Sequence, residues 1–220
     1  MPAGTVYGVL LNGQCEWQQW AAQMDQPPYL APPAAPVLYI KTANTWSPHG
    51  RAIALAPDVP ELEIGATVAM VIGPAQRLSG PPLSMQCVAG LVLLNDLCVP
   101  HASYFRPPVR YRCRDGLLGI AADLVGPAVV GDPDLLKLEV RVNGELRQSI
   151  DFSRMRRSAA QLLADVAGFM TLRPHDILML GCDCPDGGSR PRARAGDRVE
   201  ISAPGCAALG TLANTLVAQP

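Results

Sequence analysis

The sequence predicts an α+β fold dominated by β-strands, in one domain of 220 residues. The chain contains 22 prolines and 20 glycines, which divide it into short segments. The apolar runs between them are rich in β-branched residues and have about the length of a strand. Strands come first, then one well-specified helix, then more strands. Because strands and helices do not alternate regularly, this order favours mixed sheets over a doubly wound parallel sheet.

The elements are predicted in chain order. Strands are expected at 6–11, 37–40, 67–72, 138–142 and 146–150. Asn143-Gly144 separates the last two, and this dipeptide between apolar runs is a strong hairpin signal. A helix is expected at 14–24, followed by a proline-rich extended connector at 26–36. The N-terminal strand, helix and connector then occupy 1–36, and the body of the domain occupies 37–220.

The second helix is the best specified element. Ser158-x-x-Gln161 has the pattern of a capping box, in which two side chains satisfy backbone groups at the helix start. Apolar residues follow at helical spacing and are expected on one buried face: Leu162, Leu163, Val166, Phe169 and Met170.

Composition bounds the partners and the compartment. A net charge of −1, with 17% charged residues, gives no electrostatic footprint for nucleic acid or an anionic membrane. The apolar runs are shorter than the roughly 20 residues that cross a bilayer, and no secretion signal is recognised at the N-terminus. Seven cysteines, an odd number, indicate reduced thiols. We therefore expect a soluble cytoplasmic protein with neither a nucleic-acid nor a membrane partner.

Polar residues recur directly behind the apolar run 87–94. Asn95-Asp96 comes first, then Tyr104 and Arg106, then Arg112. A carboxylate at the end of a buried strand is costly unless it is paired or bound to a cation. Asp96 therefore requires a partner, which is either a metal ion or one of the neighbouring arginines.

Seven segments in order resemble the fumarylacetoacetate hydrolase-like family over roughly 7–217. They are Ile40-Lys41-Thr42-Ala43-Asn44-Thr45, 68–73, 88–96, Arg114-Asp115-Gly116, 142–145, 169–176 and 195–199. Within the family, the sequence is most similar to the branch that forms the N-terminal half of bifunctional isomerase/decarboxylases of 4-hydroxyphenylacetate (homoprotocatechuate) degradation. The resemblance implies mixed sheets rolled into a barrel-like body.

The resemblance also implies a chemistry. Family enzymes use Mg²⁺ or Mn²⁺ as a Lewis acid on small carboxylic acids from ring cleavage. The implied role is that of a subunit of a 5-oxopent-3-ene-1,2,5-tricarboxylate decarboxylase / 5-carboxymethyl-2-hydroxymuconate isomerase. It would form a homo-oligomer, or a hetero-oligomer with a metal-competent paralogue. The alternatives are a chain that is catalytic alone, through Lys41, Arg106 and an ion at Asp96, and a non-catalytic binding or structural homologue.

Two departures from the family pattern weaken the implied metal site. Alignment on Val71-Ile72-Gly73 puts Gly65 and Thr67 where active members carry two glutamate ligands, and the family's catalytic His near the first strand is missing. Glu61 and Glu63 are four residues early, which displaces them by roughly 13 Å along a strand. They are the remaining candidate ligands beside Asp96, the third family ligand. We therefore expect a degenerate metal site and doubtful independent catalysis.

Candidate ligand-binding residues follow from the same resemblance. Lys41 and Asn44 follow an apolar strand and are expected either to hold a substrate carboxylate or to serve as ordinary strand-end residues. Tyr104, Arg106 and Arg112 are expected to line a pocket for carboxylates, because guanidinium groups offer fork-shaped donors.

Two further motifs have a structural alternative. His175 stands where the family has a turn glycine, so it is expected to be a turn residue. Cys182-Asp183-Cys184, with Cys206 downstream, gives a weak zinc signal, and the alternative is a simple loop substitution.

Overall fold

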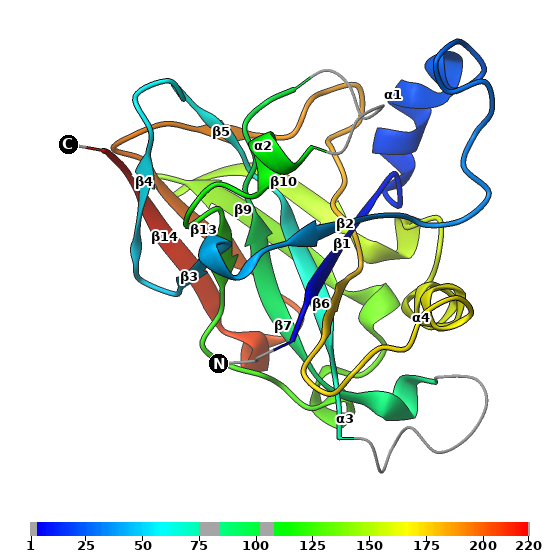
Figure 1. Ribbon diagram of the computed structural model, residues 1–220. Helices are drawn as coiled ribbons and strands as arrows, with labels where there is room; N and C mark the ends of the chain where they lie inside the picture. Colours follow the sequence, from blue (N-terminus) through cyan, green and yellow to red (C-terminus); the bar gives the residue numbers. More distant parts are fainter. Residues whose placement is uncertain (1–3, 75–83, 102–107, 220) are drawn as a thin grey trace.

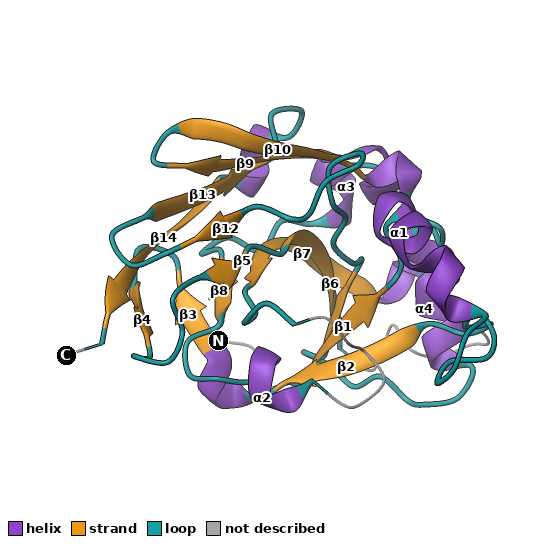
Figure 2. Cartoon of the chain, turned by 90° about the horizontal axis from the view of Figure 1, so that it is seen from above, coloured by secondary structure: helices purple, strands orange, loops and turns teal. Residues whose placement is uncertain are grey.

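The computed structural model describes residues 4–74, 84–101 and 108–219. It confirms the predicted fold class: the chain is strand-rich, with few helices and a mixed sheet that curls into a half-barrel (Figures 1 and 2). The strands are β1 (Val6–Leu10), β2 (Val37–Lys41), β3 (Trp46–Pro48), β4 (Ala52–Leu55), β5 (Leu62–Glu63), β6 (Ala66–Ile72), β7 (Val88–Asp96), β8 (Leu118–Ile120), β9 (Lys137–Val142), β10 (Glu145–Asp151), β11 (Ile177–Met179), β12 (Arg192–Ala193), β13 (Arg198–Ser202) and β14 (Thr211–Ala218). The α-helices are α1 (Gln14–Met24), α2 (Val109–Arg112), α3 (Pro127–Val130) and α4 (Ala159–Ala167).

Seven strands form the curled sheet, in the order β2-β1-β11-β6-β7-β8-β3. β1 pairs with β11 in parallel and with β2 antiparallel, so the N-terminal strand lies inside the sheet. The long pair β6–β7 is antiparallel and forms the centre of the sheet. Figure 2 shows the strands bending around, with β2 and β3 as the two outer strands of the curl.

A five-stranded sheet, ordered β10-β9-β13-β14-β4, packs across the curled sheet. The main apolar core lies between them and includes residues of both sheets and the buried face of α4, such as Met70, Leu93, Val140, Leu163 and Ile201. A smaller cluster occupies the other, concave face of the curled sheet: Val6, Ala69, Val71, Val92, Leu94, Leu118, Ile120, Ile177 and Met179. The curled sheet is therefore buried on both faces.

The predicted hairpin is confirmed. β9 and β10 pair antiparallel around Asn143-Gly144, where φ is 53° and 81°. Positive φ at both central residues defines the turn that matches strand twist, and asparagine and glycine adopt it at low cost.

Both predicted helices are present. α1 spans the predicted residues, and α4 begins at Ser158, whose side chain and that of Gln161 form the capping box. α4 ends at Ala167, however, so Phe169 falls beyond its last turn and is exposed rather than on the buried face. The stretch 26–36 consists of turns and irregular chain rather than one extended segment.

The described residues contain no helix long and apolar enough to cross a membrane. All seven cysteines are free thiols.

Candidate functional site

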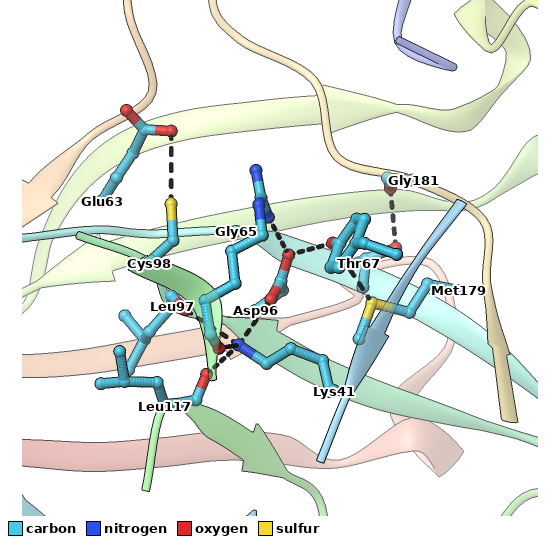
Figure 3. A network of polar contacts seen from close by, with 12 residues as sticks. Lys41, Glu63, Gly65, Thr67, Asp96, Leu97, Cys98, Leu117, Met179 and Gly181 are labelled. Carbon is cyan, nitrogen blue, oxygen red and sulfur yellow. Dashed lines mark hydrogen bonds and ion pairs between the residues drawn. The ribbon is translucent and has the colours of Figure 1, made fainter. Parts of the chain in front are cut away.

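One end of the concave face carries polar side chains in place of apolar ones. Successive side chains of a strand point to opposite faces, so Asp96 follows Val92 and Leu94 onto the concave face, and Thr67 lies there with Ala69 and Val71. Tyr39 and Lys41 reach the same place from β2, as their contacts with Asp96 show. Figure 3 shows this cluster.

Asp96 is fully buried and is surrounded by groups of the protein itself. Its Oδ2 accepts hydrogen bonds from Arg112 Nη1, at 2.7 Å, and from the Tyr39 hydroxyl. Its Oδ1 lies 2.9 Å from Lys41 Nζ. Burial alone would raise the pKa of Asp96, but the charges of Lys41 and Arg112 outweigh it, so the pKa is lowered and the carboxylate is ionised. The salt bridge with Arg112 is the alternative that the sequence left open for Asp96.

Lys41 has every donor in use. Its three N–H groups match three backbone carbonyl oxygens, those of Leu97, Arg112 and Leu117, at 3.0, 2.6 and 2.7 Å. Asp96 Oδ1 adds an ion pair rather than an aligned hydrogen bond. The side chain is buried, so the ammonium group ties β2 to the ends of β7 and α2 and to the start of β8 (Figure 3). Lys41 therefore fits the structural alternative and has no donor left for a ligand carboxylate.

Arg112 is buried but only partly satisfied. Its guanidinium lies 4.4 Å from the centre of the Tyr39 ring, in a cation–π contact, and its Nη1 holds Asp96. Its side chain is 1% exposed, and its Nε and Nη2 have no hydrogen-bond partner in the described structure. Unmade hydrogen bonds of a buried charged group are costly, so this open edge requires an acceptor.

A second buried network lies beside the first. Arg190 contacts Glu63 Oε1 at 3.0 Å and Glu16 Oε1 at 3.3 Å. Glu63 also lies 3.9 Å from the Sγ of Cys98, two residues beyond Asp96, which places the two networks side by side (Figure 3). Burial raises the pKa of Glu16, and the charges of Arg190 and then Arg112 oppose that rise. The second network thus joins α1, β5 and the 181–191 segment.

Asp183 has a structural role in the described residues. Its carboxylate accepts hydrogen bonds from the backbone N–H of Glu16, Cys15 and Cys184. It therefore caps the N-terminus of α1 from a segment far away in the sequence. The described residues contain no group of three or more His, Cys, Asp or Glu side chains placed to hold a metal ion.

The other predicted residues lie apart from the Asp96 cluster. Asn44 is exposed and holds Cys113 O and Asp115. Glu61 pairs with Arg192 at the surface. Tyr104 and Arg106 lie outside the described residues, so their predicted role stays a prediction.

The three histidines have other surroundings. The ring of His101 stacks on Tyr111, and His49 accepts the N–H of Ala213. His175 has a φ of 72°, which confirms it as a turn residue in the place of a glycine.

The described donors do not fit a divalent cation. Position 65 is glycine, and an added Cβ would lie 2.3 Å from the backbone oxygen of Asp96. The Thr67 hydroxyl donates to the Gly181 carbonyl oxygen. Asp96 already faces two cations, and Lys41 and Arg112 against Asp96 leave a charge of +1 that repels a third. A hard cation requires several free oxygen ligands, and these three positions supply none.

Sequence reasoning missed Tyr39, Glu16 and Arg190. Tyr39 alternates with Lys41 along β2, so the strand period was a signal that both side chains share a face. Glu16 and Arg190 are 174 residues apart, and no local pattern predicts their contact.

Fold and site together define a strand-rich half-barrel domain with a buried ionic cluster inside its curl. Residues 5–217 match the family model described as fumarylacetoacetate (FAA) hydrolase C-terminal. The chain belongs to this family.

Two curated relatives show the branch of the family to which the chain is similar. It is 36% identical over 216 residues to a 4-hydroxyphenylacetate degradation bifunctional isomerase/decarboxylase of Salmonella dublin, covering 98% of this chain and 48% of the relative. It is 32% identical to the protein of the same name from Escherichia coli, covering 92% and 45%. The chain thus spans about half the length of these relatives. Its match to the N-terminal half in particular stays a prediction.

Solved structures support the fold. The 5-carboxymethyl-2-hydroxymuconate delta-isomerase of Mycobacterium smegmatis superposes with a TM-score of 0.74 at 23% identity, covering 100% of this chain and 81% of the other. The fumarylpyruvate hydrolase of Pseudomonas aeruginosa, solved with Mn²⁺ and pyruvate, gives 0.75 at 21%, covering 98% and 90%.

Proposed function

We propose that this chain is one component of an isomerase/decarboxylase of 4-hydroxyphenylacetate breakdown, acting in the cytoplasm beside a metal-competent partner of the same family. The reaction class is that of a 5-oxopent-3-ene-1,2,5-tricarboxylate decarboxylase / 5-carboxymethyl-2-hydroxymuconate isomerase. Its support is the 36% identity to a bifunctional relative of which this chain covers 48%. In this proposal the chain binds a small carboxylic acid and assists the partner, rather than carrying out the reaction alone.

The observation that carries the assisting role is the state of Asp96. Two cations of the protein contact this carboxylate, and positions 65 and 67 contribute no carboxylate. A metal site that has degenerated in this way leaves a pocket suited to binding, because Arg112 keeps an open edge, whereas Lys41 is fully engaged. Lys41 and Tyr39 then act as positioning residues.

Co-expression with a metal-competent family member tests the proposal. We expect a complex on gel filtration and a Mn²⁺-dependent decarboxylation rate that falls when this chain is left out. A rate unchanged by its omission, with no complex, contradicts the proposal. Arg154→Lys serves as the matched control for arginine variants, since Arg154 pairs with Asp186 at the surface and lies outside the cluster.

A non-catalytic binding protein is the second candidate, favoured by the same engagement of Lys41 and Asp96. It predicts that the chain alone binds carboxylic acids and forms no complex with a paralogue. A Mg²⁺- or Mn²⁺-dependent turnover by the purified chain would exclude both candidates.

A further inference from the structure

We infer that the open edge of Arg112 is a metal-independent site for one carboxylate group of the ligand. This inference deepens the proposed function, since it rests on the proposal that the pocket binds a small carboxylic acid. It specifies which atoms bind the acid, and how many carboxylates the cluster takes.

The atoms follow from how the guanidinium is used. Arginine has five N–H donors in a planar fork, and Nε with Nη2 forms the side edge that matches the two oxygens of a carboxylate. In this chain Asp96 takes Nη1, so the guanidinium is held in place while its side edge remains without a partner. Tyr39 packs against the face of the same group and donates to Asp96. Both contacts fix the fork before a ligand arrives.

Charge sets the sign of the missing acceptor. Lys41 and Arg112 carry two positive charges against the single negative charge of Asp96, and all three are at most 1% exposed. One carboxylate on Arg112 brings this network to neutrality. Water satisfies the hydrogen bonds but leaves the buried charge, so an anion is the better partner.

The neighbouring network limits the ligand to one carboxylate at this place. Arg190 is the buried cation next in line, and it is already shared between Glu16 and Glu63. Two carboxylates around one guanidinium leave that network with a charge of −1, which repels a second anionic group. The adjoining part of the ligand is therefore uncharged, and a hydroxyl or enol O–H suits the carboxylate oxygens there.

Ligand binding to the isolated chain, in EDTA and without a partner subunit, tests the inference. The probes are butyrate and succinate, which have the same number of carbons but one and two carboxylates. We expect saturable binding of both, with affinities within a few-fold of each other. Arg112→Lys keeps the charge beside Asp96 but loses the fork, so it should weaken binding by about tenfold or more. Arg154→Lys should leave binding unchanged.

A spectroscopic readout on the unmodified chain covers the case in which Arg112→Lys does not fold. The Nε–H resonance of Arg112 should shift as butyrate is added, while that of Arg190, bonded to Glu63, stays in place. No binding of either acid, an unshifted Arg112 resonance, or succinate binding more than tenfold tighter than butyrate would each overturn the inference. None of these results depends on complex formation or turnover, so they are distinct from a failure of the proposed function.

Discussion

At the scale of single residues, position 65 limits what Asp96 can bind. The backbones of Gly65 and Asp96 are hydrogen-bonded neighbours in β-pairing, and an added Cβ at 65 would lie 2.3 Å from the Asp96 oxygen. The missing glutamate is therefore more than a lost side chain. The local backbone has taken a position that only glycine fits, so the ligand cannot be restored by substitution at this position alone.

Gly65→Ala is expected to destabilise the fold, by about 1–3 kcal/mol, as overpacking in a core generally does. Gly205→Ala is the matched control, because an added Cβ there meets nothing within 4 Å. Urea unfolding measures both. Equal stability of the two variants would show that the backbone at 65 moves without cost.

Lys41→Met tests the buried ammonium. It leaves three carbonyl groups without their donor and Asp96 without one of its two cations, so we expect a loss of about 3–5 kcal/mol in the free energy of unfolding. Lys137→Met is the control, since Lys137 is exposed and its pair with Asp151 lies at the surface. A similar small loss in both variants would contradict the role assigned to Lys41.

The lowered pKa of Asp96 predicts a pH dependence. An acid whose folded pKa lies below its unfolded value stabilises the fold above the unfolded value, about 3.9, and loses this contribution as pH falls through the folded value. The difference in unfolding free energy between wild type and Asp96→Asn should therefore be constant near neutral pH and shrink below about pH 4. Chemical denaturation across this range measures it. A difference that does not change with pH would refute the assignment.

At the scale of elements, the two longest helices are held in opposite ways. α4 carries its own cap, Ser158 with Gln161, which is why four residues of sequence predicted its start. α1 has no side-chain cap of its own and depends on Asp183, across 167 residues. Gly13 stands at its N-cap because a Cβ there would lie 2.4 Å from the Asp183 carboxylate.

Asp183→Ala should loosen α1 and spare α4. We expect faster amide hydrogen exchange in the first turn of α1 and a loss of about 1 kcal/mol, typical for a cap. Ser158→Ala is the converse control and should act on α4. Exchange that rises equally in both helices would indicate global destabilisation and contradict a local cap.

At the scale of the whole molecule, the N-terminal segment is part of the main sheet. The predicted division into 1–36 and a body at 37–220 separates β1 from the rest, yet β1 lies between β2 and β11. Parallel pairing with β11 joins residues more than 170 positions apart. The concave site also uses both parts, since Glu16 follows β1 and Lys41 ends β2.

A chain beginning at residue 37 is therefore expected to lose the cooperative unfolding transition of the full-length chain. The reason is that β11 loses its partner and the site loses Glu16. Near-ultraviolet circular dichroism during thermal unfolding, with the full-length chain as reference, measures this. A sharp transition in the shortened chain would contradict the role of β1.

The sequence by itself determined the local features: the strand-rich class, the hairpin at Asn143-Gly144, both helices and the turn at His175. Each depends on residues within a few positions of one another, where propensity and capping act. It also indicated that Asp96 needs a cation and that Arg112 was a candidate.

Only the tertiary structure decided which groups meet. Lys41 and Tyr39 reach Asp96 from β2, and Arg190 gathers Glu16 and Glu63 from opposite ends of the chain. Such contacts depend on how the sheet curls, and a buried charge is paired by whichever group the fold brings within reach. For that reason the sequence pointed to a set of polar residues, while the fold assigned Lys41 to the framework and left the edge of Arg112 open.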